Sequence, residues 1–176
     1  MLEWWFKNIG GEMVYQGQTH SRYRVWHPLD HIHWELVKNP RKDGTVGAGS
    51  RFRIVETFGR DLECKVDSVE LVTKLDHTGI RLVKRLFGVE IFSLEHWFQP
   101  VGDTDCSYRS LMIVGHEGWF GKLIFNRLIR PWIFTSEMGF AWLKHNIEEV
   151  GNFEFFLPDL YRSQCENRML ESDSFP

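Results

Sequence analysis

The sequence predicts an α+β domain in which a curved antiparallel sheet is followed by one long C-terminal helix. Two observations predict this order. Residues 50–116 alternate between apolar and polar side chains with the period of two that is typical of strands. After Gly118 the period becomes that of a helix and continues to about Val150. A chain of 176 residues is long enough for a sizeable core, so a single domain over residues 1–176 is expected.

The individual elements follow from local signals. Residues 2–9 are expected to form a short helix that carries Trp4 and Trp5, and an irregular segment rich in His and Trp is expected from about residue 10 to 47. Turn residues then separate four predicted strands, of which the third is either two strands or one strand bent at Gly88. The strands are 51–58, 63–75, 79–98 and 105–116.

The C-terminal helical pattern contains residues that typically interrupt or end a helix. Pro131 predicts a kink or the start of a second helix. Gly151 and Asn152 predict a C-cap, and the tail after Arg162 is expected to be frayed. Strands followed by a long helix fit the helix-grip arrangement (START or Bet v 1-like), in which the sheet wraps around the helix and leaves a cavity between them.

Composition excludes several functions and favours a cavity. A net charge of −3 and a pI near 6.2, without a stripe of Lys and Arg, argue against nucleic-acid binding. No apolar stretch reaches 18 residues and the N-terminus lacks the pattern of a signal peptide, so no membrane span is expected. Three scattered cysteines without CxxC spacing suggest a reducing cytoplasm and no thiolate site. Eight Trp and fourteen Phe exceed what a core needs, which favours a cavity wall or a site for a flat ligand.

The most informative stripe lies in the C-terminal helix. Met138, Trp142, His145 and Glu149 follow one another at helical spacing and share one face. A face directed at a core should not end in an imidazole and a carboxylate unless something pairs them. A metal ion is one such partner. A buried hydrogen bond between the two residues, or a stripe that simply reaches solvent, is the other interpretation.

A second carboxylate lies on an apolar strand face. Period two in residues 51–58 places Glu56 with Phe52, Ile54 and Phe58. Glu56 is therefore either a cavity residue or the point where this face opens to water.

Histidines supply further candidates. His27, His31 and His33 lie within seven residues, and Asp30 among them can orient a neighbouring imidazole. Any one of these histidines alone is more often a surface or packing residue. His96 shares the apolar face of its strand, so its ring needs a hydrogen-bond partner. Tyr108 is a further candidate, although alternation does not show whether its face points to the cavity.

Imidazoles and carboxylates without thiolates suit zinc with a position left open for water or substrate. Ferrous iron or manganese would also fit such a donor set.

Four segments carry a resemblance to a known family. They are the opening Trp4-Trp5-Phe6, Tyr23 with Trp26-His-Pro-Leu-Asp-His31, Gly49-Ser-Arg-Phe-Arg-Ile-Val-Glu56, and His145-Asn-Ile-Glu-Glu149 running into Glu154-Phe-Phe-Leu-Pro158. Across most of its length the chain resembles the 2,4-diacetylphloroglucinol hydrolase and phloretin hydrolase family. Members are zinc-dependent enzymes of helix-grip fold that hydrolyse a carbon–carbon bond between an acyl group and a phenolic ring.

The resemblance implies a site. The metal ligands would be His31, Glu56, His145 and Glu149, with His31 preferred to His27 because it follows Tyr23 by eight residues. Tyr23 would contact an acylated polyphenol. The chain is much shorter than that family and is expected to lack the N-terminal portion that helps to enclose the substrate.

The resemblance implies Tyr23 and His96 as catalytic residues, and Tyr108 and His27 are further catalytic candidates from the strand and histidine patterns. Tyr23 and His96 would hydrogen-bond the phenolic oxygens or move the proton, while a water attacks the acyl carbon. Exposed aromatic residues near the N-terminus would suit a homodimer contact or a lid over the cavity.

Two other classes of function stay open. One is a helix-grip module without a metal that binds an aromatic or lipid ligand, in which the polar residues are hydrogen-bonded pairs. The other is a ferrous oxygenase whose ligands come from His27, His31 and either Asp30 or Glu149.

Overall fold

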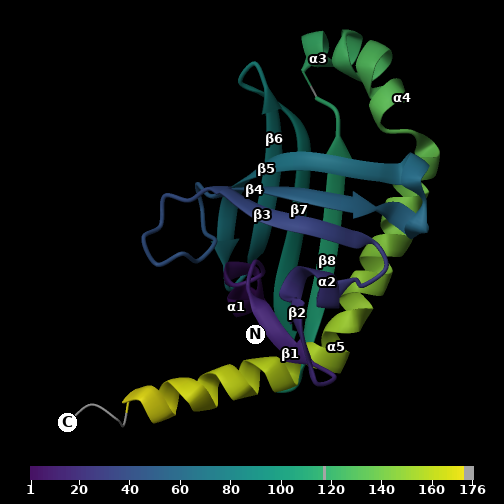
Figure 1. Cartoon of the computed structure of the whole chain (residues 1–176). Coiled ribbons are helices and arrows are strands. Elements are labelled where there is room, and N and C mark those ends of the chain that lie inside the picture. Colours follow the sequence, from purple (N-terminus) through teal and green to yellow (C-terminus); the bar gives the residue numbers. More distant parts are fainter. Residues whose placement is uncertain (117, 173–176) are drawn as a thin grey trace.

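A six-stranded antiparallel sheet forms the body of the molecule, and a 37-residue helix runs along it (Figure 1). The computed structural model describes residues 1–116 and 118–172. The strands lie side by side in chain order, and β3–β5 cross β6–β8 steeply because the sheet is strongly curved (Figure 1). They are β3 (His31–Lys38), β4 (Arg51–Thr57), β5 (Lys65–Asp76), β6 (Gly79–Leu86), β7 (Val89–Val101) and β8 (Asp105–Val114). The α+β prediction is confirmed, and the arrangement is compatible with a helix grip.

The predicted strands agree with β4 to β8 apart from their ends. The predicted strand 79–98 is two strands, β6 and β7. Phe87 and Gly88 join them with φ of 50° and 82°, the two positive values that a tight type I′ hairpin turn requires. Two short 3₁₀ turns, η1 (Phe58–Arg60) and η2 (Leu62–Cys64), connect β4 to β5.

The prediction of an irregular segment over residues 10–47 is wrong for most of its length. The segment contains a hairpin of β1 (Glu12–Tyr15) and β2 (Gln18–Ser21), the short helix α2 (Arg22–Trp26), and the edge strand β3. The longest irregular part of this segment is the loop after β3, and shorter turns precede β1 and β3. The helix expected over residues 2–9 is present as α1 (Leu2–Lys7). Strand β3 was missed because its burial does not alternate, since an edge strand is fixed by pairing with β4 rather than by one buried face.

Short helices connect the sheet to the long helix. They are α3 (Trp119–Leu123), the π-helical turn η3 (Phe125–Ile129) and α4 (Arg130–Ile133). Pro131 lies in the first turn of α4, where a missing N–H costs nothing, so the second of the predicted alternatives is correct.

Helix α5 (Ser136–Ser172) is longer than expected. The predicted C-cap at Gly151 and Asn152 is wrong, because the helix continues through both residues. The Asn152 side chain instead donates to the carbonyl oxygens of Val25 and Trp26, at 2.9 and 2.8 Å. The helix also continues past Arg162, where a frayed tail was expected; residues 173–176 lie outside the described part. Its last turns bend away from the sheet, and Pro158 lies within the helix (Figure 1).

An aromatic cluster joins the N-terminal helices to α5. Trp5 is fully buried, and its ring centroid lies 5.0–6.1 Å from those of Trp26, Phe153 and Phe156. Phe6 stacks on Phe98 of β7. Much of the aromatic surplus therefore closes one end of the space between sheet and helix. Within the described residues, no helix has the length and apolar character needed to cross a membrane.

Candidate metal centre

The four predicted ligands converge from the sheet and the helix. His31 begins β3 and pairs in register with Glu56 of β4. His145 and Glu149 extend from α5 one turn apart. His31, His145 and Glu149 are 2%, 2% and 5% exposed. The alternatives in which the helix stripe simply reaches solvent are therefore excluded.

The donor atoms are spaced like the ligands of one ion. His31 Nε2 lies 3.5 Å from Glu149 Oε2 and 3.6 Å from Glu56 Oε1, and His145 Nε2 lies 3.6 Å from Glu149 Oε2. Ligands placed 2.0–2.2 Å from a tetrahedral zinc ion would be roughly 3.3–3.6 Å apart. His31, His145 and Glu149 form a group in which every donor lies within 4.8 Å of the others. This buried cluster could hold a metal ion.

The tautomer of His31 leaves a lone pair for such an ion. Nδ1 lies 2.8 Å from the carbonyl oxygen of Tyr23, which only accepts, so Nδ1 carries the hydrogen. Burial lowers the pKa of His31 to about 4, which keeps the ring neutral at pH 7. Nε2 is then a buried acceptor that faces two carboxylates and has no hydrogen-bond partner in the part of the chain that the structure describes. A cation satisfies such an atom, whereas the protein alone leaves it unpaired.

The local charge also fits a cation. In the described part of the chain, neither Glu56 nor Glu149 has a Lys or Arg within ion-pair distance. Burial lowers the pKa of His145, but the surrounding carboxylates, with Glu149 first, outweigh burial and raise the pKa above its usual value. Buried carboxylates of this kind are normally paired or bound to a metal.

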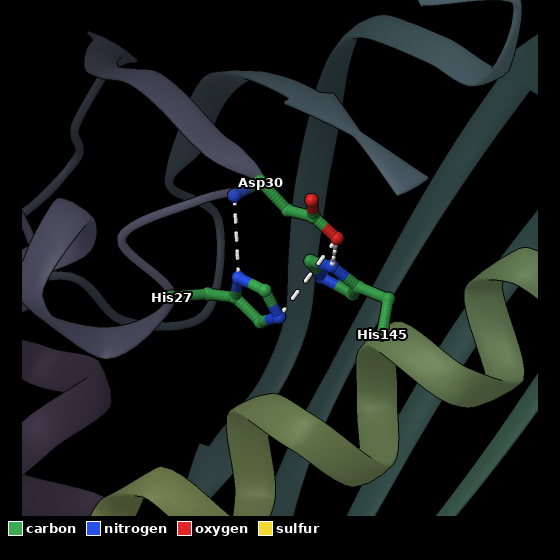
Figure 2. A group of neighbouring side chains, drawn as sticks. All are labelled: His27, Asp30 and His145. Atoms are coloured by element: carbon green, nitrogen blue, oxygen red, sulfur yellow. Dashed lines mark hydrogen bonds and ion pairs between the residues drawn. The ribbon is translucent and has the colours of Figure 1, made fainter. Parts of the chain in front are cut away.

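Asp30 fixes the orientation of His145 (Figure 2). His145 Nδ1 donates to Asp30 Oδ2 at 2.9 Å, which directs Nε2 toward Glu149. The backbone N–H groups of Gly59 and Arg60 each donate to the same carboxylate at 2.9 Å. Burial raises the pKa of Asp30, but the bond from His145 and these backbone bonds outweigh it, so the carboxylate stays ionised. A carboxylate behind a ligating histidine is a common way to fix its tautomer and raise its basicity.

His27 lies on the outer side of His145 (Figure 2). Its ring stacks on His145 with centroids 4.6 Å apart, and its Nδ1 accepts from the backbone N–H of Asp30 at 3.2 Å. Its Nε2 lies 3.3 Å from Glu148 Oε2 and 3.8 Å from Asp30 Oδ2. His27, Asp30 and His145 also form a group of metal-competent atoms. His27 Nε2, like His31 Nε2, has no hydrogen-bond partner among the described residues. Asp30 Oδ2 and His145 Nδ1 already bond each other, however, whereas the hydrogen bonds of His145 and Glu149 leave His145 Nε2 and Glu149 Oε2 for an ion, so the group of His31 is the better metal site. His27 and His31 fall in different groups, which disfavours a site built from both.

Glu56 and Glu149 each have one oxygen engaged. The Tyr23 hydroxyl donates to Glu56 Oε1 through a short hydrogen bond, and the Tyr23 ring stacks on His31 at 4.0 Å. Burial, and then the charge of Glu56, raise the pKa of Tyr23 well above its usual value. Asn146 donates to Glu149 Oε1 at 2.6 Å and leaves Oε2 for the imidazoles. Sequence reasoning missed Asn146, although its position three residues before the predicted ligand Glu149 on the same helix was a signal that could have found it.

The remaining predicted residues lie beside the centre. His96 lines the cavity next to it, and its Nδ1 lies 2.9 Å from Ser110 Oγ. Burial lowers the pKa of His96 to about 4. Tyr108 packs against His96 and has a buried hydroxyl without a hydrogen-bond partner, but it lines neither of the two cavities at the centre.

Two adjacent cavities lie beside the donors. The inner cavity, of about 50 Å³, is lined by Glu56, His145 and Glu149, and the outer cavity, of about 320 Å³, reaches η3 and α4. They share Ile54, Glu56, Leu94 and Trp142. The inner cavity is lined by Phe6, Ile9, Tyr23, Trp26, Trp34, Phe52, Ile54, Glu56, Ile80, Leu82, Leu94, His96, Trp142, His145 and Glu149. Met138 lines the outer cavity, so the whole helix stripe faces this space.

Comparison with models of protein families and with curated proteins gives no match for this chain. The function is therefore inferred from the geometry of the site.

Proposed function

We propose that this protein is a zinc-dependent hydrolase of helix-grip fold that cleaves the carbon–carbon bond between an acyl group and a phenolic ring. The observation that carries the proposal is the unpartnered Nε2 of His31, buried 3.5 Å from Glu149 and 3.6 Å from Glu56. The substrate class comes from the resemblance to the 2,4-diacetylphloroglucinol and phloretin hydrolases. The aromatic walls of the inner cavity support it, because they suit a flat ring.

The donor set favours zinc. His31, His145 and Glu149 would be its ligands, and Glu56 would be a fourth ligand that substrate or water can displace. When bound, zinc supplies Lewis-acid polarisation of a substrate oxygen. Ferrous iron or manganese would use the same donors.

The reaction adds one water across the acyl–ring bond. The water oxygen bonds to the acyl carbon, the bond to the ring carbon breaks, and that ring carbon takes a proton, which yields a carboxylic acid and the free phenol. The Tyr23–Glu56 pair lies in the inner cavity and would hold this proton near the phenolic oxygens. His96 is neutral at pH 7 and would hydrogen-bond a second oxygen. The buried walls exclude bulk water from the reacting ring.

A module that binds an aromatic ligand without a metal is the second candidate. It is favoured by the Tyr23 and Asn146 hydrogen bonds, which already satisfy one oxygen of each glutamate. The unpaired Nε2 of His31 counts against it.

Elemental analysis of the purified protein separates the two candidates. We expect about one zinc ion per chain in the wild type and little in His145→Ala or Glu149→Ala. His33→Ala is the matched control, because His33 is exposed and should leave the zinc content unchanged. A wild type that neither contains zinc nor takes it up would overturn the metalloenzyme. Zinc-loaded protein should then release a carboxylic acid from acylated phloroglucinols, and Glu149→Ala should not.

A further inference from the structure

The outer cavity contains a buried carboxyl group that the metal centre does not use. Glu70 of β5 is 3% exposed and lines this cavity, and its Oε2 has no hydrogen-bond partner among the described residues. A buried polar atom left unpaired costs about 1–3 kcal/mol. Because Glu70 adjoins the outer cavity, a ligand group there could pair with this carboxyl group after a rotation of the side chain.

A lysine and a serine adjoin this carboxyl group. Leu71 of β5 lies opposite Val83 of β6, and the two strands are antiparallel, so Glu70 lies opposite Lys84. The side chains of Glu70 and Lys84 are therefore on the same face of the sheet. Lys84 Nζ donates to Ser68 Oγ at 3.3 Å, and Ser68 lies two residues before Glu70 on the same face of β5. Lys84 and Glu70 form no direct ion pair in the described part of the chain. Both line the outer cavity, so a small group can enter between them.

The protonation of Glu70 suits a neutral ligand. Burial, and then the charge of Glu56, raise the pKa of Glu70 to about 8 against the opposing effects of Lys84 and Ser68. Glu70 is therefore mostly a neutral acid at pH 7, able both to donate and to accept a hydrogen bond. A hydroxyl group complements this pair, because it can accept from the Lys84 ammonium and exchange a hydrogen bond with Glu70.

We propose that Glu70, Ser68 and Lys84 form a second polar subsite that binds a ring hydroxyl of the ligand. The inference rests on the proposed function for the class of ligand and deepens it. The two cavities adjoin at Glu56 and Trp142, which line both, so one ring compound that spans this boundary would place one oxygen at the metal centre and another hydroxyl at Glu70. The subsite therefore selects polyhydroxylated rings over rings with a single hydroxyl.

Binding of phloroglucinol and of phenol tests this subsite without catalysis. Quenching of tryptophan fluorescence reports binding, because Trp142 lines both cavities. We expect the wild type to bind phloroglucinol about tenfold more tightly than phenol, and Glu70→Leu to reduce that preference about fivefold. Glu70→Gln keeps a donor and an acceptor and should retain most of it. Lys84→Met should weaken phloroglucinol binding several-fold, whereas Lys42→Met, in an exposed loop, should not.

Two outcomes would overturn the subsite. In the first, the wild type binds phloroglucinol no more tightly than phenol. In the second, the preference for phloroglucinol is the same in Glu70→Leu and in Lys84→Met as in the wild type. Leucine removes an unpaired buried carboxyl group, so Glu70→Leu should fold; if it does not, Lys84→Met decides, because Lys84 is exposed. The titration is run with and without zinc. A preference that depends on Glu70 in a protein that binds no zinc supports the subsite and overturns only the hydrolase.

Discussion

His145 Nδ1 lies 2.9 Å from Oδ2 of Asp30, a residue 115 positions earlier in the chain. This bond links α5 to the turn before β3 and fixes which imidazole nitrogen faces Glu149. The backbone N–H groups of Gly59 and Arg60 hold the Asp30 carboxylate from the far side. The orientation of one proposed ligand is therefore set by three segments that are distant in sequence.

Asp30→Asn should weaken zinc binding while leaving the four proposed ligands in place. The amide cannot accept from two backbone N–H groups and His145 as an ionised carboxylate does, so the imidazole loses its fixed tautomer. We expect zinc affinity to fall about 10–100-fold. Competition with a chromogenic chelator measures it, and Asp103→Asn, at an exposed turn, is the control. Equal zinc affinity in the two variants would show that Asp30 does not strengthen zinc binding by orienting His145.

Tyr23→Phe should impair turnover without loss of metal. The substitution removes the hydroxyl that donates to Glu56 and keeps the ring that stacks on His31. We expect kcat for an acylated phloroglucinol to fall about 100-fold, the scale of a lost proton-transfer group, at unchanged zinc content. Turnover close to that of the wild type would remove Tyr23 from the proton path.

His96 should make the protein less stable in mild acid. Its pKa is about 4 in the folded chain and about 6.5 when unfolded, so the unfolded state binds more protons between these values. The stabilisation is complete above pH 6.5 and is lost as the pH falls toward 4. It is worth about 2 kcal/mol between pH 7 and pH 5.

Urea unfolding at both pH values measures this difference in free energy. Zinc is removed before the measurement. The pKa of His31 is also lowered, so protonation of this proposed ligand would otherwise be coupled to release of the metal. His96→Gln should lose about 2 kcal/mol less than the wild type over the same pH interval. An identical loss in the two proteins would mean that His96 is not held neutral in the fold.

Phe153→Ala should destabilise the attachment of α5. Phe153 is 8% exposed and contacts Trp5 and Trp26 in the aromatic cluster. Its loss should lower the free energy of unfolding by about 3–5 kcal/mol. Phe155, two residues along the same helix, is 67% exposed, and Phe155→Ala should change it by less than about 0.5 kcal/mol. Thermal or urea unfolding compares the two variants. Similar losses of unfolding free energy in both variants would mean that α5 does not bury Phe153 and expose Phe155 as the structure describes.

Local periodicity alone determined much of this protein. A period of two placed Glu56 on the apolar face of its strand, and helical spacing placed His145 and Glu149 on the face that lines the cavity. These assignments needed no tertiary information, because a side chain's direction along a regular element depends only on the backbone. The strands β4 to β8 and the α+β class follow from the same signal.

Tertiary structure decided what those faces meet. Strand β3 exists through its pairing with β4, and this pairing brings His31 opposite Glu56. The helix passes Gly151 because Asn152 and Phe153 find partners in α2, which outweigh the local stop signal. Burial of Glu70 and the bond between Asp30 and His145 also depend on long-range packing. Sequence periodicity gives each face its composition, but the burial and charge of a site arise only where separate faces come together.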